Sequence, residues 1–522
     1  MRALARREQI DSGGNWRFSP RMEEEHAKAA GFVLALLSVV ALSVAPPTAS
    51  AATPPGPKPP LTHVGRWITD AKGRAVILHG LNMVYKRPPY HPRAAGFGAE
   101  DARFLHRHGF DAIRLGLIYK GVEPRRPRHG HPAYDGRYLA RIAATQRQLA
   151  RDGVFSLLDF HQDLFNERFQ GEGWPDWQVE DDGQPNPQNG FPGNYLTNPA
   201  LNRAFDHFWA NDRVGGVALQ DEYAAAWKHV ALRFGGRDYV LGYDLLNEPW
   251  PGSEWPTCAQ PAGCPAFDGG PLAAMTRKAS RAIRRVDRRH IVWQEPNVLF
   301  NFGSQSHLPA IGSKSGLSFH GYCLTPGAPD CPTTEARVFD NADDEAARTD
   351  RALLLTEFGA TDDLSDIRRI AALADRHMVS WLEWAYCGCK DPTGSIPPIV
   401  EALVKNPARP PRAGNVKHAK LKALDRPYPQ AVAGTPTRFS YERAGRRFSL
   451  RYSTRAPAGH RLPRGTETVV YVPRVHYRHG YRVAVSGATA KRRRPRARYV
   501  RLLNKPGARS VRLRIAPRRR AQ

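Results

Sequence analysis

The stretch YDLLNEPW at residues 243–250, together with LLTEFG at residues 354–359, decides the fold of this 522-residue chain. Each is an apolar run typical of a buried strand, and each carries one glutamate near its end, Glu248 or Glu357. In a parallel barrel the chemical groups of a site gather at the carboxyl ends of the strands. Two glutamates in such positions predict a pair of carboxylates that face one cavity.

Apolar runs of the same kind recur along the chain, with helical stretches between them. Eight such runs span residues 75–84, 112–119, 155–161, 240–248, 291–296, 316–323, 353–359 and 379–386. Strands that are apolar on both faces and alternate with helices are typical of a parallel sheet with helical crossovers. We therefore predict an α/β fold, a (β/α)₈ TIM barrel over residues 61–429, with Glu248 closing the fourth strand and Glu357 the seventh.

The chain changes character after the predicted barrel. Short alternating runs, for instance residues 447–452 and 510–515, are separated by turn residues, and no long helical stretch follows. This pattern predicts a small C-terminal antiparallel β-sandwich over residues 430–522.

Positive charge is concentrated in this C-terminal part. Of a formal net charge of +28, residues 431–522 supply +23, with 25 Lys and Arg against Glu442 and Glu467. The basic clusters are residues 491–494, Arg496, Arg498 and residues 518–520. Such a module is expected either to hold the protein on an anionic membrane or cell-envelope surface or to be a solvated, Arg-rich domain end. Nucleic acid is not expected as a partner, because no recognition motif accompanies the charge.

The N-terminal region has the features of an export signal. Residues 32–45 form an apolar run too short to span a bilayer comfortably, and Ala49-Ser50-Ala51 follows as a cleavage pattern. We expect residues 1–51 to be a signal peptide region cut near Ala51, with an uncleaved anchor as the alternative, and residues 52–60 to be a Pro-rich linker. A secreted protein is therefore expected, and we also expect a monomer.

Six cysteines in an exported chain predict disulfides. Two pairs would close short loops, Cys258 with Cys264 and Cys323 with Cys331. Cys387 and Cys389 lie too close in sequence for an easy mutual bridge. The pairing stays open, since six cysteines allow 15 combinations. No pair has the spacing and histidine partner of a structural zinc site, so neither a metal nor another cofactor is expected.

The two glutamates suit glycoside hydrolysis. That reaction needs an acid to protonate the leaving oxygen and, in the retaining mode, a carboxylate about 5 Å away to attack the anomeric carbon. Glu248 is the candidate acid/base and Glu357 the candidate nucleophile. A single strand-end glutamate is often only solvated or salt-bridged, but two on one barrel favour catalysis.

The motifs Asn247-Glu248-Pro249 and Thr356-Glu357-Phe358-Gly359 resemble those of glycoside hydrolase family 5, and the similarity extends over roughly residues 61–428. Within that family the closer resemblance is to actinobacterial endoglycoceramidases and endogalactosylceramidases. The matching segments are HGLNMVYK (79–86), DFHQD (159–163), FHGYC (319–323) and WLEWAY (381–386). The resemblance implies a retaining endo-β-glycosidase that cleaves between oligosaccharide and ceramide, a glycosphingolipid as substrate, and a C-terminal β-sandwich.

Further residues are candidates for the same site. Arg114 can pair with Glu357 and keep it ionised, because a nearby cation lowers the pKa of a carboxylate. Tyr322 can donate its hydroxyl to Glu357, and Asn247 can bond the sugar 2-hydroxyl. The remaining candidates are His161 and His320 as sugar-binding and supporting groups, Lys86 and Asp163, which resemble sugar-gripping residues, and Trp384 as a stacking platform. The structural alternatives are core histidines, a core tryptophan and an exposed Lys86–Asp163 ion pair.

The loops expected to rim the site are apolar, and the long segment 162–213 is expected to be a lid or a disordered insert. The rim residues are Phe160, Phe165, Phe169, Trp174, Trp177, Trp250, Trp255, Leu299, Phe300 and Phe302. Such rings suit a lipid or a glucan chain equally, and the family resemblance favours ceramide. Two alternatives stay open. One is a family 5 enzyme for a steryl or alkyl glucoside, a β-glucan or a mannan, and the other is a non-catalytic carbohydrate-binding envelope protein.

Overall fold

The computed structural model describes residues 55–128, 131–323, 327–394, 397–491, 494 and 496–518. The predicted signal peptide, the first residues of the predicted linker, and Arg492, Arg493, Arg519 and Arg520 of the basic clusters lie outside these ranges. No helix within the described ranges is long and apolar enough to cross a membrane.

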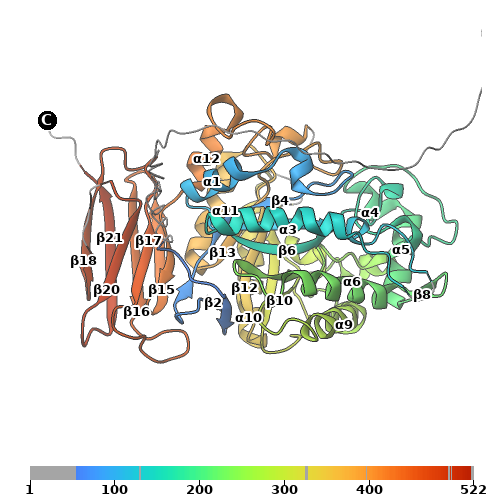
Figure 1. Ribbon diagram of the computed structural model, residues 1–522, viewed down its shortest axis with the longest axis horizontal. Coiled ribbons are helices and arrows are strands. Elements are labelled where there is room, and N and C mark those ends of the chain that lie inside the picture. The colour runs from blue at the N-terminus through green and yellow to red at the C-terminus, as the bar shows by residue number, and fades with distance from the viewer. Residues whose placement is uncertain are drawn as a thin grey trace, which may run out of the picture. The chain divides into compact units, whose positions relative to one another are not determined.

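Eight parallel strands close into a barrel, which confirms the predicted fold (Figure 1). In chain order they are β4 (His79–Met83), β5 (Ala112–Ile118), β6 (Phe155–His161), β9 (Val240–Asp244), β10 (Ile291–Gln294), β11 (Ser315–Gly321), β12 (Ala352–Phe358) and β13 (Ser380–Glu383). Every residue of these strands is buried. Helices cover the outside and side chains fill the inside, so the strands appear in the sequence as continuous apolar runs.

Helices cross over between successive strands, except that β10 and β11 are joined through the 3-10 helix η6 (Val298–Phe302). The crossover helices are α1 (Ala99–Arg107), α3 (Gly136–Arg151), α6 (Leu219–Phe234), α9 (Ala273–Arg284), α10 (Cys331–Thr349) and α11 (Leu364–His377). The helix α3 begins after Asp135, whose side chain accepts hydrogen bonds from the backbone N–H groups of Arg137 and Tyr138. Such an N-cap satisfies backbone donors that the helix itself leaves without acceptors.

The two glutamates lie on the fourth and seventh units of the barrel. Glu357 is within β12, whereas Glu248 lies four residues beyond the end of β9. The predicted fourth strand is therefore too long. Glu248 has a φ of 44°, in the left-handed region, so the chain has left the extended conformation before it reaches this residue.

The C-terminal region is a β-sandwich, as predicted. One sheet contains β14 (Tyr428–Val432), β17 (Glu467–Tyr471), β20 (Tyr499–Asn504) and β19 (Ala488–Ala490). The other contains β15 (Thr435–Glu442), β16 (Arg447–Ser453), β21 (Ser510–Pro517) and β18 (Tyr481–Ser486). Apolar side chains of both sheets, among them Val470 and Leu513, form one core.

Three short strands near the start of the described chain also join the first sheet of the sandwich. They are β1 (Thr62–Val64), β2 (Trp67–Thr69) and β3 (Ala75–Val76), and β3 pairs with β14. The single strand predicted for residues 75–84 is therefore two strands. The first pairs within the sandwich and the second, β4, pairs within the barrel.

The segment 162–213 is a structured insert. It contains η2 (Glu167–Phe169), η3 (Asp176–Gln178), α4 (Gly193–Thr197) and α5 (Pro199–Ala210). Phe165, Phe169 and Trp174 are buried in the main core, as is Phe160 in β6, and Phe165 stacks on Trp174 with ring centroids 4.2 Å apart. The prediction that these four rings rim the site is wrong, because they pack the insert onto the barrel. The prediction is also wrong for Phe300, which is buried.

The structure contains three disulfides, Cys258–Cys264, Cys323–Cys331 and Cys387–Cys389. The first two are the pairs that would close short loops. The third contradicts the expectation that Cys387 and Cys389 are too close to pair. Their Cα atoms lie 5.1 Å apart, within the usual range for a bridge.

Candidate active site

Glu248 and Glu357 face each other at the carboxyl end of the barrel. One carboxylate oxygen of each and a ring nitrogen of His320 all lie within 4.8 Å of one another. Both glutamates line a cavity of about 470 Å³. Carboxyl groups about 5 Å apart are typical of retaining glycosidases, whereas inverting enzymes leave roughly 6.5–9.5 Å for a water molecule.

Hydrogen bonds hold the Glu248 side chain in place. Its Oε1 accepts from His320 Nδ1 at 2.8 Å and from Asn301 Nδ2 at 3.0 Å. Its backbone N–H donates to Glu295 Oε2 at 2.9 Å. No protein group in the described ranges donates to its second oxygen, Oε2, which leaves that atom for a ligand.

Arg114 and Tyr322 hold Glu357, as the sequence predicts. Arg114 donates to Oε1 at 2.5 Å, and the Tyr322 hydroxyl donates to Oε2 at 3.0 Å. Burial raises the pKa of Glu357 above its ordinary value, although His320 and Arg114 oppose that rise. Arg114 does act to lower the pKa of Glu357, as predicted, but the desolvation of the carboxylate outweighs the nearby cations, so the pKa of Glu357 is raised.

Arg114 is fully buried and contacts four carboxylates. The distances are 2.5 Å to Glu357, 2.5 Å to Glu295, 2.9 Å to Asp244 and 3.1 Å to Asp159. Burial alone would lower the pKa of Arg114, but these carboxylates raise it well above its ordinary value. The guanidinium stays charged and fixes the positions of groups from several strands.

Replacing Arg114 with Met should destabilise the fold by about 3–5 kcal/mol, because removal of one partner leaves the other buried charges uncompensated. The free energy of unfolding, measured in urea, tests this. Arg114→Lys keeps the charge but loses the planar fork, so it should lose less stability than Arg114→Met. An unchanged free energy for Arg114→Met would show that the surrounding carboxylates are neutral in the folded protein.

The sequence prediction missed several polar residues of the site. They are Asp159, Glu172, Asp244, Glu295, Asn301, Asp391, Thr393 and Glu401.

Burial alone would raise the pKa of Glu295, but His320 and Arg114 lower it. Burial alone would lower the pKa of His320, but Glu295 and Glu357 raise it well above its ordinary value. A signal for Glu295 exists, since it directly follows the apolar run of β10.

Part of the cavity wall is an ion cluster around Lys86. Lys86 Nζ lies 2.5 Å from Asp163 Oδ2, 2.8 Å from Thr393 Oγ1 and 2.9 Å from Asp391 Oδ2. Both Lys86 and Asp163 are buried, so the exposed ion pair considered as an alternative is wrong. Burial alone would lower the pKa of Lys86, but the neighbouring carboxylates raise it well above its ordinary value.

Trp384 and His161 complete this part of the wall. The Lys86 ammonium lies 4.7 Å from the centroid of the Trp384 ring, and His161 stacks on that ring with centroids 5.2 Å apart. Trp384 Nε1 donates to Glu401 Oε2 at 3.0 Å. Burial alone would lower the pKa of His161, but Asp159 and its other partners raise it to about 10. This surface offers an aromatic plane with charged groups at its edge, which suits a sugar.

The rest of the wall is largely apolar. Its residues are Phe191, Pro192, Tyr195, Leu196, Trp250, Val298, Leu299 and Phe302. Of the predicted apolar rim, Trp250, Leu299 and Phe302 do reach the cavity. Phe191 and Leu196 remain 43% and 47% exposed, so the apolar wall continues to the protein surface.

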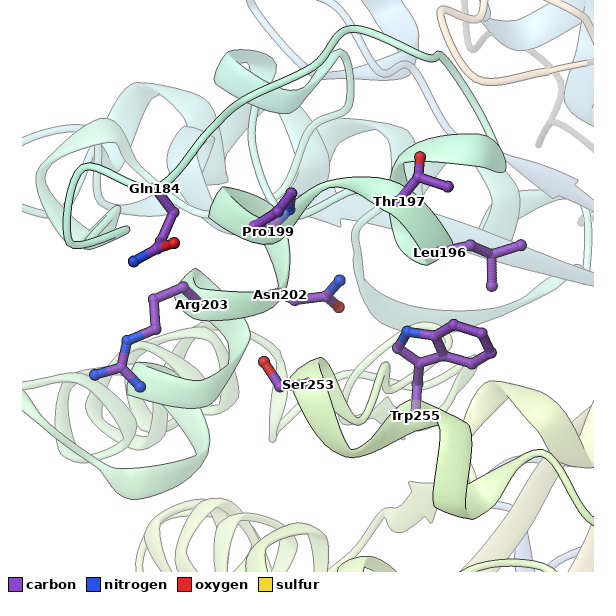
Figure 2. A pocket seen from close by; sticks show the side chains of 8 residues that line it. All are labelled: Gln184, Leu196, Thr197, Pro199, Asn202, Arg203, Ser253 and Trp255. Atoms are coloured by element: carbon purple, nitrogen blue, oxygen red, sulfur yellow. The ribbon is translucent and has the colours of Figure 1, made fainter.

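A second pocket of about 330 Å³ adjoins this apolar wall (Figure 2). Leu196 lines both pockets. Figure 2 shows Trp255 below Leu196, with Asn202 and Ser253 beside it. The Trp255 ring stacks on Trp250 with centroids 5.7 Å apart. Trp255 therefore belongs to the second pocket, most of whose other lining residues are polar.

Eight of the predicted site residues line the cavity, and two lie behind it. The eight are Lys86, His161, Asp163, Asn247, Glu248, Tyr322, Glu357 and Trp384. Arg114 and His320 are buried behind the glutamates and hold them. Asn247 accepts from Arg114 at 3.0 Å and donates to the Gln162 carbonyl at 2.9 Å.

Within the described ranges, three groups of side chains bring possible metal ligands together, and other contacts already engage each of them. In the first, Lys86 pairs with Asp163 beside His161 and Glu172. In the second, His320 hydrogen-bonds Glu248 beside Glu357. The third contains Cys323, Cys331 and Asp330, and its cysteines form a disulfide.

The chain matches two models of one enzyme family. Residues 69–390 match Cellulase (glycosyl hydrolase family 5), and residues 426–515 match the Glycoside hydrolase family 5 C-terminal domain. The chain is 32% identical to Endoglycoceramidase I of Rhodococcus hoagii over 455 residues, 83% of this chain and 84% of that protein. It is 30% identical to Endoglycoceramidase of Cyanea nozakii over 459 residues, 80% of this chain and 85% of that protein.

A solved structure has the same fold over nearly its whole length. The lactosyl-enzyme intermediate of Endo-glycoceramidase II from Rhodococcus sp. superposes with a TM-score of 0.69 at 27% identity, covering 86% of this chain and 99% of that one. With the barrel, the facing glutamates and both family matches in agreement, the chain belongs to glycoside hydrolase family 5.

Proposed function

We propose that this protein is a retaining endo-β-glycosidase that hydrolyses the bond between the oligosaccharide and the ceramide of glycosphingolipids. One observation carries the proposal. A single cavity holds two facing glutamates, a charged aromatic surface around Trp384 and Lys86, and an apolar wall that reaches the protein surface at Leu196. The similar proteins are named endoglycoceramidases, and one structure of the Rhodococcus enzyme is titled a Ganglioside GM3 complex.

In the proposed mechanism Glu248 starts as the acid and Glu357 as the nucleophile. Glu357 attacks the anomeric carbon while Glu248 protonates the glycosidic oxygen, and the ceramide leaves as an alcohol. Glu248, now a carboxylate, takes a proton from water, which attacks the glycosyl ester and releases the sugar and Glu357. Two displacements at one carbon retain its configuration. Arg114 and Tyr322 fix the attacking carboxylate for this purpose.

The two kinds of wall suit the two halves of the substrate. Trp384 is the stacking platform, Lys86 and Asp163 bind sugar hydroxyls, His161 supports them, and Asn247 contacts the 2-hydroxyl. The apolar wall receives the ceramide next to the glycosidic oxygen. Because Phe191 and Leu196 are exposed at the surface, the hydrocarbon chains of the ceramide are expected to leave the cavity past them.

Incubation with a glucosylceramide-type glycolipid, a galactosylceramide-type glycolipid and cellulose tests the proposed function. Mass spectrometry should find intact ceramide and a free oligosaccharide. Within a series of alkyl and ceramide glycosides, kcat/KM should rise about fourfold for each methylene that the apolar wall buries. Activity on cellulose alone, or equal rates on short and long aglycones, would exclude a lipid-specific enzyme and favour another family 5 substrate.

The pKa of Glu357 predicts the acid side of the pH profile. The nucleophile must be deprotonated, and burial raises its pKa above 4.5. As pH falls, activity should therefore be lost at a higher pH than the one at which an exposed glutamate becomes protonated. His320→Gln removes a cation that lowers this pKa, so the acid limb of kcat/KM should move to still higher pH. A limb that moves to lower pH in the variant would contradict this account.

We further propose that the protein is secreted after cleavage near Ala51 and acts as a monomer. The short apolar run and the small residues that follow it support export. We also propose that the basic C-terminal module holds the enzyme on an anionic membrane or cell envelope, and its charge of +23 over residues 431–522 supports this. N-terminal sequencing of the secreted protein tests the cleavage site.

A further inference from the structure

The outward face of one sheet of the sandwich carries a group of exposed arginines. This sheet has the strand order β15, β16, β21, β18, and Figure 1 shows β16, β21 and β18 in the C-terminal part of the chain. Phe439, Leu450 and Leu513 point into the sandwich core, so the alternate residues face outward. The exposed outward residues that form this arginine face are Arg438, Arg447, Arg451, Arg482, Arg512 and Arg514.

The strand register places like charges directly opposite each other. Arg438 on β15 pairs with Arg451 on β16, and Arg451 pairs with Arg512 on β21. Side chains in such positions have Cβ atoms about 4.5–5.5 Å apart, and like charges there destabilise a sheet. A row of three arginines across three strands is therefore not explained by the stability of the sandwich.

The arginine face also has few counter-charges. Of its six arginines, only Arg447 has an ion-pair partner among the described residues, Glu442. The basic clusters predicted from the C-terminal sequence are in part paired with carboxylates, since Lys491 pairs with Glu467 at 2.5 Å. Unpaired charge therefore lies on the sheet and not only in the terminal clusters.

We propose that the arginine face binds the phosphate groups of anionic lipid headgroups and so holds the enzyme on the membrane that contains its substrate. The membrane is inferred as the partner from the proposed function, whereas the anion-binding site is inferred from the strand register alone. A guanidinium presents a planar fork of donors that matches a phosphate. A sheet face with several arginines can contact several headgroups at once, and each basic residue near an anionic surface adds to binding.

The residues between the arginines disfavour single-stranded nucleic acid as the partner. Ser440, Ser449, Ala484 and Ser486 occupy outward positions in the same rows. Proteins that bind single strands stack the bases on aromatic side chains, and the outward positions named here carry none. The face therefore offers phosphate-binding groups without platforms for bases.

The test compares two triple variants with the same loss of charge. Arg451→Gln/Arg512→Gln/Arg514→Gln removes the centre of the arginine face. Arg277→Gln/Arg281→Gln/Arg285→Gln is the matched control, because these arginines are exposed on α9 or at its end and have no ion-pair partner in the described ranges. Each protein is sedimented with vesicles of phosphatidylglycerol and phosphatidylcholine, and with vesicles of phosphatidylcholine alone.

The arginine-face variant should bind the anionic vesicles about 100-fold more weakly than the wild type, since each basic residue near the surface contributes roughly fivefold. The control variant should lose much less. Binding should weaken with salt and be absent on phosphatidylcholine alone. Equal binding of all three proteins to the anionic vesicles would overturn the proposal. The proposal would also be overturned if the wild type preferred an anionic polysaccharide or DNA to the anionic vesicles and the arginine-face variant lost that preference.

Activity separates this inference from the proposed function. Both variants should cleave a soluble aryl glycoside at the wild-type rate, because none of these arginines lines the catalytic cavity. The arginine-face variant should be slow only on a ceramide glycoside in anionic vesicles and should recover in detergent micelles. If the wild type binds anionic vesicles but cleaves no ceramide glycoside, the proposed substrate is wrong and the arginine face stands. The melting temperature should not fall, since like charges are removed.

Discussion

Glu357→Gln should lower kcat by about 10⁴-fold or more on every substrate that the enzyme accepts, because the amide has no lone pair basic enough to form the glycosyl ester. Substrate binding should change little. The amide keeps the shape of the carboxylate, and Arg114 and Tyr322 still surround it. Steady-state rates on an aryl glycoside, with titration of a product sugar for binding, measure the two effects separately.

The folded state supplies the control for this variant. Burial raises the pKa of Glu357, so a neutral group at this position should not reduce stability greatly. A melting temperature near that of the wild type, together with the loss of turnover, would assign the effect to chemistry. Turnover at the wild-type rate in a folded Glu357→Gln protein would show that another group attacks the sugar.

Glu248→Ala should have an effect that depends on the leaving group. General acid/base catalysis contributes about 10²–10⁴-fold, so hydrolysis of a ceramide glycoside, whose alkoxide leaves poorly, should fall by that amount. A dinitrophenyl glycoside needs no protonation to leave. The first step should therefore survive on this substrate, and the glycosyl-enzyme should accumulate because no base activates water.

Azide distinguishes this role from a structural one. A small anion can occupy the space of the missing carboxylate and attack the glycosyl-enzyme without a base. Added azide should restore turnover of the dinitrophenyl glycoside by Glu248→Ala and give the β-glycosyl azide. No rescue, or an α-product, would contradict the assignment of Glu248. Asn301→Ala is a useful comparison, since it removes one hydrogen bond to Glu248 and keeps the acid.

The two glutamates have different neighbours. Glu357 contacts the permanent charge of Arg114, whereas Glu248 accepts from His320 and Asn301 and leaves one oxygen toward the cavity. Glu295 lies behind both, paired with Arg114 and bonded to the backbone of Glu248. This third carboxylate keeps His320 charged, so it positions both glutamates without lining the cavity.

The sequence predicted the barrel because a parallel strand is buried on both faces, so the strand appears in the sequence as a continuous apolar run. All eight runs correspond to strands, and the strand order placed Glu248 and Glu357 at one end. The same reasoning placed His161 and Trp384 at the site, whereas Lys86 and Asp163 were placed there by the family resemblance. These are local patterns, and neighbouring residues are sufficient to read them.

Groups that pair over long sequence distances were not predictable in the same way. Lys86 contacts Asp391 and Thr393, about three hundred residues further along the chain. No periodicity links such partners, because the closed barrel brings the loops after its first and last strands together. The pairing of β3 with β14 in the sandwich was not predictable either, because these two strands lie far apart in the sequence.

The sequence alone determined which residues are apolar, which are charged and how strands alternate with helices, and these features predict a parallel barrel with two glutamates at one end. The motifs around those glutamates carry the resemblance to family 5. Only the tertiary structure decided which aromatic rings reach the cavity, since Phe165 and Trp174 instead pack the insert against the barrel. It also decided that Glu357 has a raised pKa and that arginines face one another across β16 and β21. Burial and strand register are properties of distant segments in contact, and a stretch of sequence does not contain its own neighbours in space.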